Sequence, residues 1–487
     1  MKTPPSVSAL GIVSAFVMAL GGCASSSVNA DVRDVNVFLA AQHRATGNSV
    51  RSVGSVALPN EENWQDDGAE TPKILAKPLT VDNAVQLALA QNRDLRASMY
   101  ELGIARGQAL QASLLPNPEI EVSLRKQEDP FQDLQADLGF EYNLSALILV
   151  PLRKGVADAE FEATRVRVAR DVLETAYQAR LAFYDVQARQ TILDLRKRAF
   201  DAFQASYAAA EELHRVGNLA DIDFATQRAA VEAARIEVAE AENAVLDARE
   251  RFNVAAGLSG TQTTWTLAAP LPHPDDAAFD PASNEKKAIA ASLELIELAK
   301  RMEAVAKRVG LHRTEGALPH LSGGFHGEQD GISWELGGHF TVALPIFDRA
   351  QGRILSAKSE LGSLRERYVA TAVAVRASTR MAQNRVESAG KRAQHFRRAL
   401  IPAREQALAE TLLQYNAMHV SVFQLLDVQR KVTEAGIAYT ETLLDYWKAR
   451  AALDQVLAGG RRPQAMASVN TGQTSAASMD TGSGAGH

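Results

Sequence analysis

Four short segments of alternating apolar and polar residues, placed in two pairs between long helical segments, constrain the fold of this chain most. The first pair covers about residues 119–125 and 134–144. A period of two is typical of a β-strand whose two faces meet different surroundings. The apolar positions are the even-numbered ones, namely Ile120, Val122, Leu124, Leu134, Ala136, Leu138, Phe140, Tyr142 and Leu144.

The second pair flanks Asp330-Gly331, a dipeptide that favours a tight hairpin turn. Centring the hairpin there pairs Phe325 with Leu336, and the apolar side chains then share one face. The opposite face carries polar residues, namely His320, Ser322, His326, Glu328, Ser333, Glu335, His339 and Thr341. The sequence therefore predicts hairpins at about 118–145 and 319–344.

An apolar outside and a polar inside are what a membrane β-barrel needs, because lipid cannot satisfy an open strand edge. The smallest such barrels have about eight strands, so several copies of this chain must share one barrel. The residues expected to line its lumen are Glu119, Glu121, Asp137, Glu141, His320, His326, Glu328, Glu335 and His339. Such an acidic lumen favours cations. The histidines lack the close ligand spacing of a zinc site, so we predict polar lining and no metal site.

The N-terminus is typical of an export signal, with Lys2 followed by a short apolar run from Val7 to Leu20. The run ends in Gly21-Gly22-Cys23, which resembles a lipobox, so residues 1–22 are predicted to be a lipoprotein signal peptide. Cys23 is the only cysteine of the chain and the predicted lipid attachment site. The alternative is an ordinary secretory signal with a chance cysteine. Ser25 at the second place after Cys23 favours the outer membrane.

Several classes of function are excluded by composition and motifs. The net charge of −6, without a basic stripe, gives no sign of nucleic-acid binding. No metalloprotease, phosphate-loop, serine-hydrolase or dithiol motif is present, so we predict a non-enzyme without a cofactor. No second stretch is apolar enough for a transmembrane helix.

The chain repeats one plan with an offset of about 200 residues. Leu115-Pro116 before the first hairpin recurs as Leu318-Pro319 before the second. Seven-residue spacing of apolar side chains predicts antiparallel coiled-coil pairs of helices. One helix is expected from Leu152 to His214, about 90 Å long, and Pro402 is expected to kink or break its counterpart.

The predicted organisation has six parts. A lipid-anchored linker, with a short helix from Asp31 to His43, follows the signal peptide, and a disordered tail ends the chain. The ranges after the signal peptide are 23–78 for the linker, 79–260 for the first repeat, 261–284 for the connection, 285–458 for the second repeat and 459–487 for the tail.

Several short sequence motifs from Leu79 onward resemble those of the TolC-like outer-membrane efflux family. They are Ala84–Leu89 with Asn92, Leu115–Pro118, Leu344–Asp348, and Tyr415-Asn416 with the stretch Ser421–Asp427. The resemblance implies an α+β fold that is mostly α, with long antiparallel coiled-coil helices and two hairpins. It also implies a homotrimer, whose strands form a twelve-stranded barrel in the outer membrane that a periplasmic α-helical barrel continues.

The resemblance further implies two helical tips that dock a periplasmic adaptor and an inner-membrane pump of the resistance-nodulation-division type. The matching positions are Arg215, Val216, Gly217 and Asn218 at one tip, and Tyr415, Asn416, Ala417, Met418 and His419 at the other. The second tip departs from the family, because Met418 or His419 replaces a common glycine.

A periplasmic gate is also implied near the second tip, where family members carry acidic residues. Gln424 and Asp427 match these positions, so the first acidic place is neutral here. Asp221 and Asp223 at the first tip could form a comparable ring, which attracts cations. Alternatively, these aspartates only stabilise helix ends.

Three functions remain. The first is a passive exit duct for small molecules or metal cations in a tripartite efflux system, in the outer membrane of a Gram-negative bacterium. The second is the exit duct of a type I protein-secretion system. The third is a lipid-anchored periplasmic scaffold without a pore. The acidic lumen and the lipobox favour efflux.

Overall fold

The structure, a computed structural model, describes residues 28–46, 71–125, 135–274, 281–330 and 333–461. The predicted signal peptide, Cys23, and the tail beyond residue 461 lie outside the described residues. In the described part of the chain, no helix is both long enough and apolar enough to cross a membrane.

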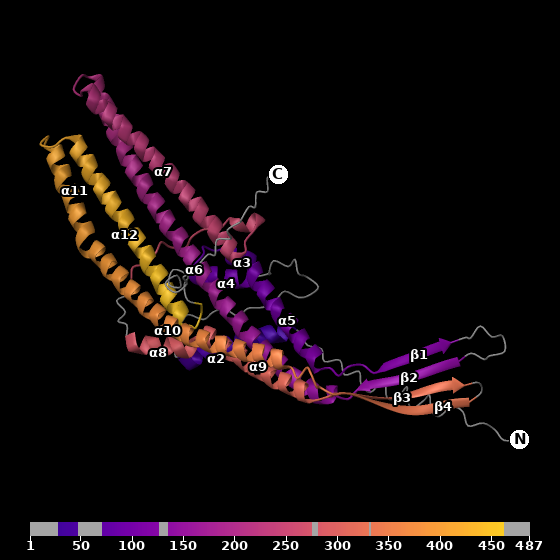
Figure 1. Ribbon diagram of the computed structural model, residues 1–487. Helices are drawn as coiled ribbons and strands as arrows, with labels where there is room; N and C mark the ends of the chain where they lie inside the picture. The colour runs from indigo at the N-terminus through magenta and orange to yellow at the C-terminus, as the bar shows by residue number, and fades with distance from the viewer. Residues whose placement is uncertain (1–27, 47–70, 126–134, 275–280, 331–332, 462–487) are drawn as a thin grey trace, which may run out of the picture.

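The described chain is mostly helical, with one four-stranded sheet (Figure 1). The elements of its first half are α2 (Val28–Thr46), α3 (Thr71–Leu75), α4 (Val81–Gln91), α5 (Arg93–Ser113), β1 (Glu119–Arg125), β2 (Gln135–Asn143), α6 (Ala146–Arg215), α7 (Asp221–Ala256) and a 3-10 helix (Gly260–Thr263). Those of its second half are α8 (Pro281–Ala291), α9 (Leu293–Ala317), β3 (His320–Asp330), β4 (Ser333–Ala343), α10 (Gln351–His395), a π-helical segment (Phe396–Leu400), α11 (Ile401–Asn416) and α12 (Val422–Leu457).

The molecule is elongated, with the sheet at one end and two helical hairpins at the other (Figure 1). The hairpins are α6–α7 and α11–α12, and the remaining helices lie between them and the sheet. This arrangement is the mostly helical α+β fold that the sequence predicted.

The helix α6 has 70 residues, and at 1.5 Å per residue it is about 105 Å long. It begins at Ala146, six residues before the predicted start at Leu152. Contacts with the second half of the chain fix this early start. The Ser145 hydroxyl accepts from the Leu321 N–H at 2.6 Å, and the Leu144 N–H donates to the Leu321 carbonyl at 2.8 Å. Pro151 consequently lies inside the helix, where it removes one backbone donor.

The predicted seven-residue repeats lie in the core of the helical region. Val172, Ala179, Val186 and Leu193 of α6 are all buried, as an apolar seam between packed helices requires. Against this seam, Phe183 of α6 contacts Phe252 of α7 edge to face, with ring centroids 5.5 Å apart.

The segment between the halves contributes to the same core. Trp265 is buried against Phe252, with ring centroids 4.9 Å apart, and its indole N–H donates to the Asn253 side chain at 2.9 Å. A short parallel bridge joins Leu79 to Leu267. The segment between the halves therefore links Leu79, just before α4, to the end of α7.

Pro402 follows a local change of helix type, as the sequence predicted. The five residues Phe396–Leu400 are π-helical, and Pro402 is then the second residue of α11. A proline donates no backbone hydrogen bond, so a regular α-helix cannot continue through it without losing one bond.

The sheet is antiparallel throughout, in the order β1-β2-β3-β4. The two hairpins are adjacent, because β2 pairs with β3 and places Phe140 opposite Phe325. The two halves of the chain are thereby joined at the centre of the sheet.

The second hairpin differs from its predicted register by two residues. Phe325 lies opposite Gly338, and Leu336 lies opposite Gly327, with Asp330 opposite Ser333. The predicted turn at Asp330-Gly331 is therefore wrong, and the strands instead flank residues 331–332. This register places large apolar side chains opposite glycines. A methyl group on Gly327 would lie 3.1 Å from Leu336 Cδ2. A shift of two residues preserves each side chain's face, so the predicted faces are unaffected.

Candidate functional site

The sheet has two chemically different faces. The apolar face carries Ile120, Val122, Leu124, Leu138, Phe140, Phe325, Trp334, Leu336, Phe340 and Val342, all of them exposed in the single chain. Leu336 is 85% exposed and Phe325 is 71% exposed. A continuous apolar surface on a protein marks contact with another apolar surface, such as lipid or a partner.

The polar face carries the residues predicted to line a lumen. The register places them in rows across the sheet. One row contains Ser123, Asp137, Glu328 and Glu335, and the next contains Glu121, Gly139, His326 and Gly337. A third row contains Glu119, Glu141, Gly324 and His339. The polar face is therefore strongly acidic. The positively charged Arg125 pairs with Asp137 on this face.

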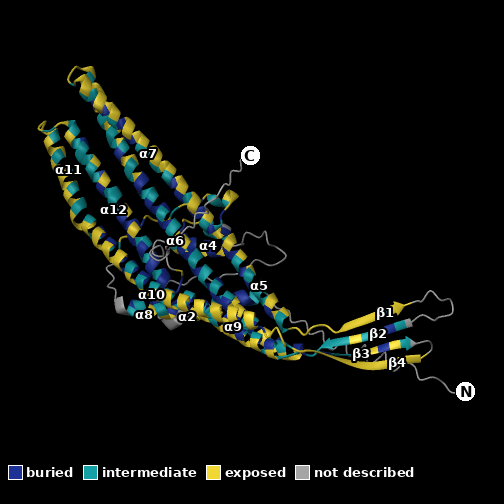
Figure 2. Cartoon of the chain, viewed as in Figure 1, coloured by how far each residue is buried: buried dark blue, intermediate teal, exposed yellow. Residues whose placement is uncertain are grey.

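Both edge strands are open in the described part of the chain. The sheet ends at β1 and β4, and these strands are exposed along nearly their whole length (Figure 2). Unpaired strand edges expose backbone donors and acceptors that another strand can pair with.

The first tip, residues 215–218, closes the α6–α7 hairpin through a left-handed glycine. Gly217 has φ of 78°, its N–H donates to the His214 carbonyl at 3.0 Å, and the Asn218 N–H donates to the Leu213 carbonyl at 2.8 Å. These two bonds satisfy carbonyls at the end of α6. Near this tip, the His214 ring stacks on Phe224, with centroids 4.5 Å apart.

The second tip, residues 415–419, closes the α11–α12 hairpin by the same pattern without a glycine. Met418 has φ of 59°, its N–H donates to the Tyr415 carbonyl at 2.9 Å, and the His419 N–H donates to the Gln414 carbonyl at 2.9 Å. Met418 as a whole residue is 93% exposed, so no packing in the single chain offsets its backbone strain.

Two of the residues predicted to form a gate, Asp427 and Gln424, have local side-chain partners. Asp427 pairs with Lys431 at 2.6 Å and more distantly with Arg430 at 3.7 Å. The hydrogen bond from Lys431, aided by the nearby positive charges, lowers the pKa of the Asp427 carboxyl. The Gln424 side chain accepts from the Ser421 N–H at 3.3 Å, which completes a capping box at the start of α12.

The acidic pair at the first tip lies in the first turn of α7. There a negative charge interacts favourably with the helix dipole. The Asp221 carboxylate also pairs with His214 Nε2 at 2.8 Å across the tip. Asp221 therefore has a structural contact in the single chain, as the alternative interpretation expects.

A groove between the two helical hairpins lies beside Asp427. It encloses about 300 Å³ and is lined by Gln227 and Ala230 of α7, Phe203 of α6, and Asp427 and Arg430 of α12. Its walls come from both halves of the chain, about 200 residues apart, so the local sequence pattern did not predict it.

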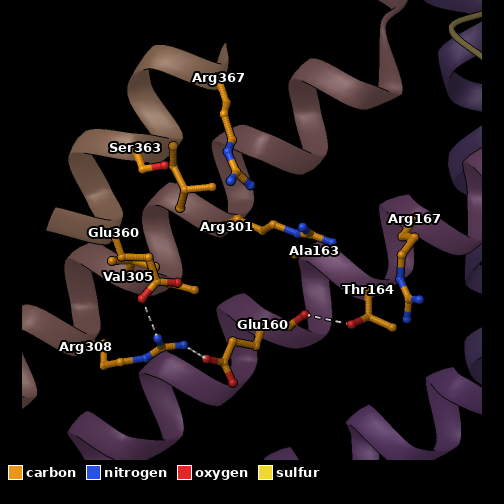
Figure 3. A pocket seen from close by; sticks show the side chains of 12 residues that line it. Glu160, Ala163, Thr164, Arg167, Arg301, Val305, Arg308, Glu360, Ser363 and Arg367 are labelled. Atoms are coloured by element: carbon orange, nitrogen blue, oxygen red, sulfur yellow. Dashed lines mark hydrogen bonds and ion pairs between the residues drawn. The ribbon is translucent and has the colours of Figure 1, made fainter. Parts of the chain in front are cut away.

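A larger cavity of about 450 Å³ lies among α6, α9 and α10 (Figure 3). Its lining includes four arginines and two glutamates. Arg308 of α9 pairs with Glu160 of α6 and, at 3.1 Å, with Glu360 of α10 (Figure 3). Arg301 pairs with Glu297 outside the cavity at 2.5 Å. The two ion pairs of Arg308 connect the three helices.

Comparisons with known proteins support the family resemblance. No family model matches the chain. The chain is 25% identical over 396 residues to the cobalt-zinc-cadmium resistance protein CzcC of Cupriavidus metallidurans, which covers 79% of this chain and 91% of CzcC.

Solved structures share the fold. A membrane protein from Pseudomonas aeruginosa aligns with a TM-score of 0.67 and 19% identity, over 80% of this chain and 94% of its own. CusC, whose structures concern transmembrane channel formation, aligns with a TM-score of 0.65 and 15% identity, over 78% and 92%. The CmeC outer-membrane channel of Campylobacter jejuni aligns with a TM-score of 0.62 and 15% identity, over 86% and 92%. The predicted resemblance is thereby confirmed.

Proposed function

We propose that this chain, which resembles the TolC-like outer-membrane efflux proteins in sequence and shares their fold, forms the exit duct of a tripartite efflux system. The observation that carries the proposal is the sheet, with its exposed apolar face, acidic polar face and two open edges, at one end of long helical hairpins. A periplasmic scaffold without a pore has no use for such a sheet.

Three copies supply twelve strands, which is enough to close a barrel. Because neighbouring strands alternate in direction, β1 and β4 run opposite ways. The β4 strand of one copy can therefore pair antiparallel with β1 of the next, and closure removes both open edges. The apolar face then meets lipid, and the polar face lines the lumen.

The helical hairpins extend away from the sheet, so a barrel in the outer membrane places the two tips deep in the periplasm. There we expect them to dock a periplasmic adaptor and an inner-membrane pump of the resistance-nodulation-division type. The duct itself is passive, and we expect no enzymatic activity. Cys23 would add a lipid anchor in the outer membrane of a Gram-negative bacterium.

Two observations favour metal cations as the exported substrate. The name of its relative CzcC refers to cobalt, zinc and cadmium resistance. The acidic polar face attracts cations and repels anions. A duct for secreted polypeptides is the second candidate, but neither observation favours it.

The pore and the anchor can be tested separately. Mass measurement of the purified protein in mild detergent should give three copies, and planar bilayers should show cation-selective conductance. A stable single copy with full strand content contradicts the shared barrel. Labelling cells with radioactive palmitate should mark the wild type but not Cys23→Ala, and equal labelling of both rejects the lipid anchor.

A further inference from the structure

One cluster on the polar face combines three groups that can bind a metal ion. Asp137 of β2 lies opposite Glu328 of β3, and His326 lies one row away on the same face. One ligand atom from each residue lies within 4.8 Å of the other two. The cluster joins the two halves of the chain, because β2 belongs to the first hairpin and β3 to the second.

Asp137 is the unusual member of the cluster, since it is only 5% exposed. Its Oδ2 atom accepts from Arg125. Its Oδ1 atom is fully buried and finds no hydrogen-bond donor among the described residues. A buried carboxylate oxygen without a partner is destabilising, because it has lost its hydration without gaining a donor, and a cation bound there would satisfy it.

The residues beside His326 in its row are glycines, which place no side chain against the imidazole. Gly139 and Gly337 flank His326 in its row. A methyl group on Gly139 would lie 3.8 Å from His326 Nδ1 and 3.8 Å from Glu121 Oε2. A larger side chain at position 139 would therefore occupy the space between the imidazole and the Glu121 carboxylate.

We propose that Asp137, His326 and Glu328 form a binding site for a divalent transition-metal cation such as Zn²⁺ or Co²⁺. One imidazole nitrogen and two carboxylate oxygens suit these borderline cations. The cluster lacks the thiolate or thioether that soft monovalent copper prefers, and the imidazole disfavours Mg²⁺.

The charges around the cluster permit a cation to bind. Arg125 opposes it, but this guanidinium lies on the edge strand, is mostly exposed, and contacts only the Oδ2 atom. Asp137 and Glu328 together outweigh this positive charge, and Glu335 lies directly opposite Glu328. Three protein ligands leave open positions for water, so bound ions can exchange.

The use of this site as a transit point for exported cations rests on the proposed function, whereas ion binding does not. In a barrel of three copies, three such sites would lie at one height of the lumen. An ion could then bind and leave again at that height during passage, as conduction through a selective pore requires.

The test is a titration of the full-length protein, purified without a histidine tag in mild detergent and freed of metal by a chelator. Zn²⁺ binding is measured by competition with a chelating dye, and Co²⁺ by its visible absorption. We expect one ion to bind per chain. The Co²⁺ absorption spectrum should be of the kind that an imidazole ligand gives. His326→Ala and Asp137→Asn should each weaken binding at least about tenfold.

His320→Ala is the matched control, because His320 lies on the same strand and the same face but outside the cluster. It should bind as the wild type does. Absence of binding by the wild type, or equal affinity of the wild type, Asp137→Asn and His326→Ala, overturns the site. Conductance in planar bilayers separates the two proposals: a conducting protein that binds no ion rejects only the site, and an ion-binding protein without a pore rejects only the duct.

Discussion

Met418 occupies at the second tip the position that Gly217 occupies at the first. Both residues follow the end of a helix in the left-handed conformation, with φ of 59° and 78° respectively. At both tips the same two backbone hydrogen bonds close the turn. The conformation costs little for glycine but about 1 kcal/mol or more for methionine. A nearly fully exposed methionine kept at a strained position fits a surface that a partner covers.

Met418→Gly should make the second tip more stable by about 1 kcal/mol, because glycine adopts the left-handed conformation without strain. Hydrogen exchange of the amides at positions 418 and 419, which donate the closing bonds, should slow accordingly. Gly217→Ala is the matched control and should speed exchange at positions 217 and 218. Unchanged exchange in Met418→Gly would show that the turn carries no strain.

Asp427→Asn should lower cation selectivity while leaving three copies assembled. The substitution removes one negative charge per copy and leaves Lys431 and Arg430 without this partner. Lys431→Gln is the opposite control, because it leaves the Asp427 carboxylate with only the more distant Arg430 of its two ion-pair partners and should raise cation selectivity. Reversal potentials in planar bilayers under a salt gradient measure both. If neither variant differs from the wild type, the constriction lies elsewhere, for example at Asp221 and Asp223.

Cation selectivity at the second tip should resist acid. The Asp427 carboxyl has a pKa below its ordinary value of 3.8, because Lys431 donates to it. A lowered pKa means that the ion pair is fully present above the ordinary value and is lost only as pH falls through the lower one. Selectivity measured from neutral pH downward should therefore persist through pH 4 on the periplasmic side. Its loss between pH 6 and pH 5, which are about one to two units above the ordinary carboxyl range, would assign the selectivity to other groups.

Leu336→Arg should weaken assembly in the membrane by about 2–4 kcal/mol if its site lies near the bilayer midplane. Leu336 lies on the apolar face, whereas the adjacent Glu335 lies on the polar face. Glu335→Arg should therefore assemble normally and shift conductance toward anions. The yield of trimer extracted from outer membranes measures the difference. Equal yields of both variants would mean that the faces are assigned wrongly.

Pro402→Ala should straighten the junction between α10 and α11. Alanine restores a backbone N–H that can donate to the carbonyl four residues earlier, so the π-helical segment loses its cause. No residue of α11 is buried in the single chain, and little packing opposes the change. Spin labels on the two tips should report a changed distance. Pro151→Ala, inside the regular helix α6, should leave that distance as in the wild type. If the Pro402→Ala variant also keeps the wild-type distance, Pro402 is not the cause of the π-helical segment.

The faces of the strands could be predicted because alternation is a local pattern. The exact pairing of β3 with β4 could not be predicted. It depends on the contacts of Leu336 with Gly327 and of Phe340 with Gly323, which the turn dipeptide alone does not indicate. The predicted start of α6 was wrong for a similar reason, because Leu321 holds that junction from the other half of the chain.

The candidate sites show the same limit. The tips could be located from the sequence, since helix ends and turn residues are close together in the chain. The cluster of Asp137, His326 and Glu328 could not, because Asp137 lies about 190 residues before the other two and meets them only through the pairing of β2 with β3. The partners of Asp427 are in contrast one helical turn away, so their spacing alone could have suggested them.

Two helical segments that connect the sheet to the tips differ in stiffness. One is the helix α6, and the other is the run from α10 to α11, which the π-helical segment at Phe396–Leu400 divides. A bending force applied at the tips meets regular α-helical hydrogen bonding between Pro151 and the first tip in α6, and a weaker π-helical turn in the second segment. Bending should therefore concentrate at this π-helical turn, so that the second hairpin moves while the first keeps its position relative to the sheet.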